Sequence, residues 1–118
     1  MDDSTDHVPI IDIPAAVWRY QDAHDHHDTD RALSAFTPGA TVVDEDREYH
    51  GTEEIRRWLE VAGREFTYKR TFLDAAAIDA ATWVIHNRLE GNFPGKIADL
   101  RYRFTLSDGV ISRLVIAP

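Results

Sequence analysis

The stretch from Pro38 to Leu59 reads PGATVVDEDREYHGTEEIRRWL and decides the fold. A short strand, 40–44, contains β-branched residues and ends in an aspartate, Asp44. A charged turn follows, then a return strand over about 47–50 and a helix that starts at 51–52. Because Asp44 follows an otherwise apolar strand just before the chain turns back, we expect its carboxylate to face a pocket instead of bulk water.

Helical spacing of apolar residues occurs on both sides of the first strand. A first helix is expected to begin near Asp12-Ile13-Pro14, since proline is tolerated in a first turn. Residues spaced by three and four form its inward face, namely Val17, Tyr20, Ala23 or His24, and His27. Asp28 and Thr29 cap a second, short helix, which 37–39 ends. The third helix buries Ile55, Trp58 and Leu59 and is expected to stop at Gly63.

After the third helix the pattern changes to the period of two that is typical of strands. Four strands are predicted, over 66–73, 82–90, 97–106 and 110–116, with turns at 91–95 and 107–109. Helices followed by an antiparallel meander predict an α+β fold, in which helices pack on one face of a curved sheet.

The composition restricts the function. A chain of 118 residues predicts a single domain over 1–118, with 1–11 as a mobile lead-in. A net charge of −8 with few clustered basic residues argues against nucleic acid and anionic membranes as partners. No apolar run approaches the roughly 20 residues that span a bilayer, and the acidic N-terminus does not resemble a signal peptide, so we expect a cytoplasmic protein. The absence of cysteine excludes thiolate chemistry and zinc–cysteine sites.

The order of elements resembles the nuclear transport factor 2-like superfamily. The resemblance extends from about residue 14 to the C-terminus. It rests on the run 36–44, on Gly51 with Ile55 and Trp58, and on the closing Asp108-Gly109-Val110-Ile111. It implies a cone-shaped fold, with a strongly bent sheet wrapped around helices and a pocket inside. The superfamily includes ketosteroid isomerases, SnoaL-type polyketide cyclases, epoxide hydrolases, dehydratases and non-enzymes, so the fold by itself does not imply one reaction.

The ketosteroid isomerases offer the most informative comparison. The spacing 44 − 20 = 24 places Tyr20 on their oxyanion-donor position and Asp44 on their general-base position. Such enzymes use an aspartate base with an oxyanion hole of a tyrosine and a protonated aspartate. Here Leu100 takes the place of that second acid. Asp99 is one residue off, which points it to the other face of the strand.

Structural alternatives stand beside these roles. Asp44 could bond to its own turn or pair with Arg47, and Tyr20 could be a core tyrosine. The cluster His24-Asp25-His26-His27-Asp28 contains metal-ligating residue types. It has no second ligand pair elsewhere, so a solvated helix end with His24 at the cavity rim is favoured, and no metal is expected.

The predicted pocket wall continues onto the sheet. Trp58, Leu100 and Tyr102 are expected to face inward, as are Trp83, Ile85, Asn87 and Leu89, which alternate with outward residues. Core filling is the alternative for most of them, and Asn87 needs partners if it is buried. The direction of Arg113 is left open. The outer face carries Val84, His86, Arg88, Arg101 and Arg103. By superfamily habit it is expected to pair with a second copy in a homodimer, whereas a solvated face is the alternative.

Two functions follow from the sequence. The first is a cofactor-free enzyme that binds a small apolar molecule bearing oxygen. Asp44 would be its general base and Tyr20 its donor, in proton transfer next to a carbonyl (isomerase or cyclase) or in activation of water (hydratase or dehydratase). The second is a non-catalytic ligand-binding or dimerisation module of the same fold. The matched Tyr20 and Asp44 favour the enzyme, whereas the missing second donor favours the module.

Overall fold

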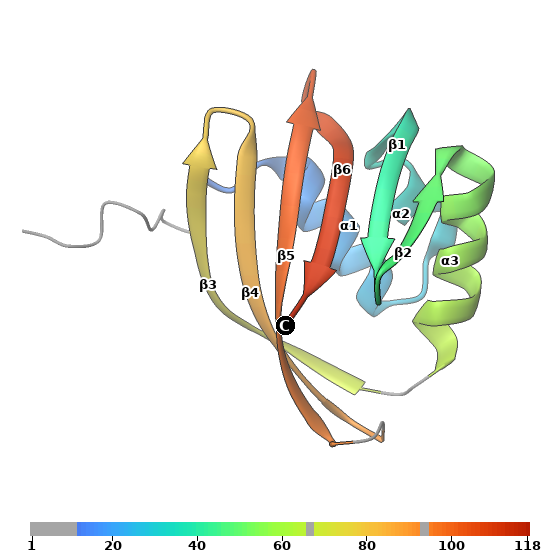
Figure 1. The fold of residues 1–118 in the computed structure, drawn as a ribbon, viewed down its shortest axis with the longest axis vertical. Coiled ribbons are helices and arrows are strands. Elements are labelled where there is room, and N and C mark those ends of the chain that lie inside the picture. The colour runs from blue at the N-terminus through green and yellow to red at the C-terminus, as the bar shows by residue number, and fades with distance from the viewer. Residues whose placement is uncertain (1–11, 66–67, 93–94) are drawn as a thin grey trace, which may run out of the picture.

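The computed structural model describes residues 12–65, 68–92 and 95–118 (Figure 1). Predictions for residues 1–11, for the start of a strand at Phe66 and for the centre of the 91–95 turn lie outside these ranges. Within them the chain forms three helices and six strands. The α+β class is therefore confirmed.

Three helices form where the apolar spacing predicted them. They are α1 (Ala15–Asp25), α2 (Thr29–Leu33) and α3 (Gly51–Glu65). The Asp28 carboxylate accepts a hydrogen bond from the backbone N–H of Arg31, 3.2 Å away, and so caps α2 as expected. The predicted stop of α3 at Gly63 is wrong, because the helix continues to Glu65.

The end of α1 corrects one prediction. The helix stops at Asp25, and His27 has a left-handed backbone (φ 57°) and an exposed side chain. The backbone N–H of Asp28 donates to the carbonyl of Ala23 at 2.8 Å, a bond that closes a helix end of this type. His27 therefore does not continue the buried stripe, which ends with Ala23 and the half-buried His24.

The six strands form one curved sheet in the order β2-β1-β6-β5-β4-β3. The strands are β1 (Phe36–Asp44), β2 (Arg47–His50), β3 (Tyr68–Asp79), β4 (Thr82–Gly91), β5 (Ile97–Ser107) and β6 (Val110–Ala117). All neighbours are antiparallel except β1 and β6, which run parallel. The sheet is thus mixed, whereas the sequence pattern predicted only antiparallel pairs.

Two strands are longer than predicted. β1 starts at Phe36, not at Ala40, and its register with β6 shifts between Phe36 and Thr41, around the Pro38-Gly39 pair. β3 continues past Leu73 to Asp79, with two further register shifts along β4. Such irregularities bend a strand and increase its twist, which suits a sheet that curves around helices.

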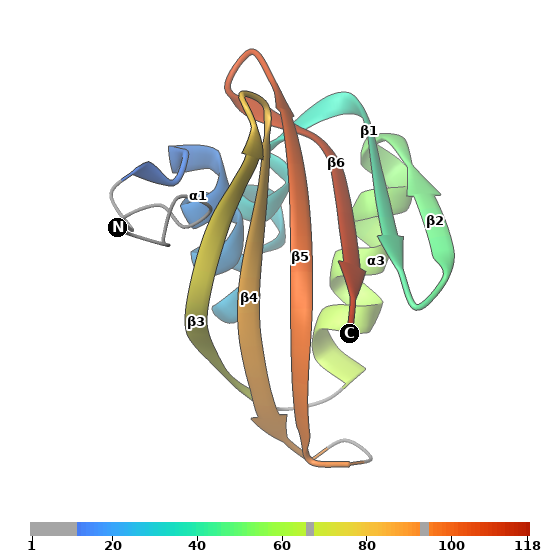
Figure 2. The same ribbon diagram turned by 60° about the vertical axis from the view of Figure 1, so that its left-hand side comes forward.

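The three helices cover one face of this sheet (Figures 1 and 2). Fully buried side chains from both layers meet there, for example Val17 and Ile55 from the helices and Phe104, Ile111 and Leu114 from the sheet. The apolar stripes of the helices and strands predict ten core residues. Nine of them are buried: Val17, Tyr20, Phe36, Ile55, Trp58, Leu59, Ile85, Tyr102 and Phe104. The tenth, Trp83, shares the face of its partner Phe104 but is partly exposed. In the part of the chain described, no helix is long and apolar enough to cross a membrane.

Candidate functional site

Asp44 lies at the last position of β1, where the chain turns sharply into β2. Glu45 and Asp46 form this turn with left-handed backbones (φ 53° and 63°), the conformation of a tight two-residue hairpin. The indole Nε1–H of Trp58 on α3 donates to Oδ2 of Asp44 at 3.1 Å. The Asp44 carboxylate thus binds the buried Trp58, and the aspartate itself is half-buried at the edge of the interior.

Tyr20 lies deeper than the sequence comparison implied. Its ring stacks on Trp58, with centroids 6.4 Å apart, and meets Phe36 and Phe104 edge to face at 5.5 and 5.8 Å. Only 1% of the residue is exposed. Burial raises the pKa of its hydroxyl well above the ordinary value, and the nearby Tyr102 and Asp44 add to the rise. Tyr20 and Asp44 therefore contact the same indole, but the tyrosine is enclosed by other rings.

Two further tyrosines share this interior with Asp44. Burial raises the pKa of Tyr68 to about 12 and the pKa of Tyr102 further still, and the charge of Asp44 contributes to both shifts. The Tyr68 hydroxyl also raises the pKa of Tyr102, and both hydroxyls raise the pKa of Tyr20. All three tyrosines thus stay protonated at neutral pH. They are potential hydrogen-bond donors near one carboxylate.

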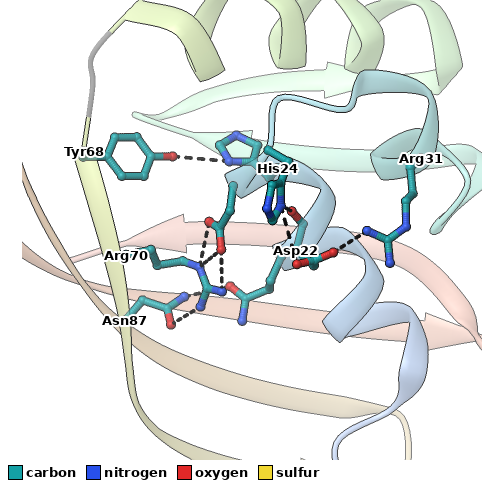
Figure 3. A network of polar contacts seen from close by, with 9 residues as sticks. Asp22, His24, Arg31, Tyr68, Arg70 and Asn87 are labelled. Atoms are coloured by element: carbon teal, nitrogen blue, oxygen red, sulfur yellow. Dashed lines mark hydrogen bonds and ion pairs between the residues drawn. The ribbon is translucent and has the colours of Figure 1, made fainter.

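His24 joins the cluster from the last turn of α1 (Figure 3). Its Nδ1 lies 3.3 Å from the Tyr68 hydroxyl, and its ring lies against Tyr20 and Trp58. Burial lowers its pKa from 6.5 to about 4, so the imidazole is neutral at pH 7. A neutral imidazole offers one donor and one acceptor. His24 therefore lies inside this cluster and not only at its rim.

A second polar network lies beside the aromatic cluster (Figure 3). The Arg70 guanidinium donates to both oxygens of Asp25 at 2.8–3.1 Å and to Oδ1 of Asn87 at 3.1 Å. Asn87 in turn donates to Oε1 of Gln21 at 2.8 Å. Among the described residues, the buried Nε2 of Gln21 has no hydrogen-bond partner. The amide of Asn87 is thus satisfied by protein groups, which is the structural alternative raised from the sequence.

The strand register separates Leu100 from Asp99 as predicted. Leu100 pairs with Asn87 and packs against the core, whereas Asp99 pairs with Arg88. The Arg88 guanidinium donates to both Asp99 oxygens at 2.8 and 3.1 Å on the exposed face. Position 100 therefore supplies hydrocarbon to the interior and no acid. Arg113, whose direction the sequence left open, is exposed.

The remaining predicted pocket residues on the sheet lie at different positions along it. Tyr102 is buried near Asp44, whereas Trp83 lies further along β4, opposite Phe104. A hollow of about 10 Å³ is lined by six residues, His24, His27, Asp28, Thr29, Ala32 and Leu59. This is about the minimum that holds one water molecule. Within the described ranges, no group of three acidic or histidine side chains could hold a metal ion.

Sequence reasoning missed Tyr68, Arg70 and Gln21. Tyr68 and Arg70 lie on the same strand face as Phe72, which packs against the core, so the period of two along β3 is a signal for them. This period does not by itself show which face of an edge strand is covered by helices. Gln21 had no such signal, since it lies next to the inward stripe of α1.

Comparisons with known proteins agree with this architecture. Neither a family model nor a curated protein matches the sequence. Among solved structures, a protein from Sinorhizobium meliloti, provisionally named a polyketide cyclase, is 34% identical, with a TM-score of 0.85 over 93% of this chain and 100% of its own.

Two more distant structures show the fold alone. One is an NTF2-like protein of unknown function from Cytophaga hutchinsonii (15% identity, TM-score 0.70, 86% of this chain and 85% of its own). The other is a ketosteroid isomerase-like protein from Catenulispora acidiphila in complex with trimethylamine (15%, 0.77, 89% and 85%). One conclusion follows from the curved sheet, from the helices on its inner face and from the 34% sequence identity with the Sinorhizobium protein. The chain belongs to the nuclear transport factor 2-like superfamily.

Proposed function

We propose that the interior around Asp44 binds a small apolar molecule that carries oxygen, and that Asp44 acts on it as a general base without a cofactor. The observation that carries this proposal is the half-buried Asp44 carboxylate, which accepts the Trp58 N–H inside an aromatic interior. An ionised carboxylate only accepts hydrogen bonds, and in this form an aspartate can take a proton from a bound molecule.

The reaction class follows from the same groups. Removal of a proton next to a carbonyl needs a base beside the C–H bond and a donor near the oxygen, where negative charge develops. Asp44 provides the base, and a protonated tyrosine near it, Tyr68, provides a candidate donor. The Sinorhizobium relative bears the name of a polyketide cyclase, and ring closure by aldol chemistry begins with this step.

One experiment tests the proposal directly. The α-hydrogens of 2-tetralone, an apolar bicyclic ketone, exchange in D₂O, and NMR measures the rate with and without the protein. We expect the wild type to accelerate exchange and Asp44→Asn to reduce that acceleration by a factor of ~10² to 10⁴. Asp99→Asn is the matched control, because this carboxylate lies on the outer face with Arg88. Wild-type exchange at the buffer rate would contradict the proposal.

A non-catalytic module is the second candidate, and specific observations favour it. Tyr20 is enclosed by rings, and Leu100 supplies no acid, so neither of the two donors of the isomerase pattern is available. Such a module would bind 2-tetralone without exchanging its hydrogens. Saturation-transfer NMR with the same ketone separates binding without exchange from the absence of any binding.

A further inference from the structure

The three tyrosines around Asp44 differ in how well a ligand could reach them. Tyr20 is 1% exposed and Tyr102 is 7% exposed, whereas Tyr68 is only partly buried. Tyr68 lies at the first position of β3, on the same face as Arg70 and Phe72, and its side chain extends toward α1 (Figure 3). Of the three hydroxyls, the Tyr68 hydroxyl is therefore the one that a bound molecule could approach.

His24 holds the Tyr68 hydroxyl in place. The two groups are 3.3 Å apart, and the imidazole itself packs against the rings of Tyr20 and Trp58. The neutral ring has one N–H. If that proton lies on Nδ1, it donates to the Tyr68 oxygen and leaves the Tyr68 proton for a ligand. A phenol that accepts a hydrogen bond is polarised into a stronger donor.

We infer that Tyr68 is the hydrogen-bond donor of the interior site to a ligand carbonyl or enolate oxygen, and that His24, as the Nδ1–H tautomer, is its positioning residue. This inference rests on the proposed binding of an oxygen-bearing molecule beside Asp44. Tyr68 then takes the role that Leu100 cannot fill and that Tyr20 is too enclosed to fill. The ligand class is then an apolar molecule whose oxygen accepts a hydrogen bond from Tyr68.

The first test needs no ligand. Long-range ¹H–¹⁵N spectra distinguish the two neutral tautomers of His24 in the wild-type protein at pH 7. We expect the Nδ1–H form, with a change in the His24 nitrogen shifts in Tyr68→Phe. The Nε2–H form would overturn the inference, because Tyr68 would then donate its proton to His24 and not to a ligand.

The second test compares two probes that differ by one hydroxyl. Naphthalene reports apolar binding, whereas 2-naphthol adds an oxygen and resembles the enol of 2-tetralone. We expect wild type to prefer 2-naphthol and Tyr68→Phe to reduce this preference roughly two- to tenfold, the effect of one neutral hydrogen bond, while naphthalene affinity is kept. Tyr49→Phe is the matched control, because it removes a tyrosine hydroxyl from β2, outside the proposed donor pair.

The outcomes separate this inference from the proposed function. If both probes bind and Tyr68→Phe keeps the preference for 2-naphthol, the role of Tyr68 is overturned but the ligand site is not. The same holds if Tyr20→Phe, and not Tyr68→Phe, loses this preference. Failure of both probes to bind the wild type would overturn the interior ligand site and the inference with it. His24→Gln should weaken the preference without abolishing it, since it removes the positioning contact and not the donor.

Discussion

The burial of His24 leads to a prediction about stability and pH. In the unfolded chain the imidazole takes up a proton near pH 6.5, whereas in the folded protein burial lowers its pKa to about 4. Arg70 and His27 also lower this pKa, and Asp25 opposes them. Between these two values the unfolded state binds more protons than the folded state. Stability therefore falls as the pH falls from 6.5 to 4, and this loss is absent above 6.5.

The size of the effect follows from the two pKa values. At about 1.4 kcal/mol per unit of pKa, the complete difference is about 3 kcal/mol. At pH 5 the linkage relation gives a loss of unfolding free energy of about 2 kcal/mol. This is a substantial part of the stability of a typical domain, which is roughly 5–15 kcal/mol.

Urea unfolding at pH 7 and pH 5, followed by tryptophan fluorescence at one protein concentration, measures the loss. Between these pH values we expect wild type to lose about 2 kcal/mol more than His24→Gln, which has no proton to take up. His26→Gln is the control, because the His26 side chain is 73% exposed in the folded protein. Parallel pH profiles for wild type and His24→Gln would refute the reasoning.

Three further outcomes are expected. Arg70→Met breaks the half-buried ion pair with Asp25 and should destabilise the protein by about 2 kcal/mol, less than the loss of a fully buried pair. Arg88→Met breaks the exposed pair with Asp99 and should cost under about 1 kcal/mol in the same urea assay. Asn87→Ala should cost about 1–3 kcal/mol, because the buried Gln21 and the half-buried Arg70 each lose a hydrogen bond; an unchanged midpoint would contradict this. We also propose a homodimer through the outer face of the sheet. Sedimentation at micromolar concentration should then show a dimer for the wild type and a monomer for Val84→Glu, and a monomeric wild type would exclude the homodimer.

Local sequence patterns determined most of the secondary structure. The spacing of Ile55, Trp58 and Leu59 places one apolar face on α3, and the alternation from Trp83 to Leu89 sets the faces of β4. These patterns work because a helix repeats every 3.6 residues and a strand every two. The register also placed Leu100 inside and Asp99 outside, since neighbouring strand residues point to opposite faces.

Tertiary structure decided the partners of the polar residues. Asp44 and Trp58 are 14 residues apart, Tyr68 and His24 are 44 apart, and Arg70 and Asp25 are 45 apart. No local period relates such positions. Asp44 and Trp58 meet because α3 packs against β1, and the other two pairs meet because the curved sheet brings the start of β3 against the end of α1. The parallel pairing of β1 with β6 has the same origin, since it joins segments from opposite ends of the chain.

The candidate site shows both contributions. The sequence by itself determined that a carboxylate at Asp44 ends an apolar strand, because the strand pattern and the following turn are local. Only the tertiary structure decided that Tyr20 is enclosed while Tyr68 stays partly exposed beside the same carboxylate. The physical reason is that burial depends on what covers a side chain. For both tyrosines the covering groups come from elements far away in the sequence.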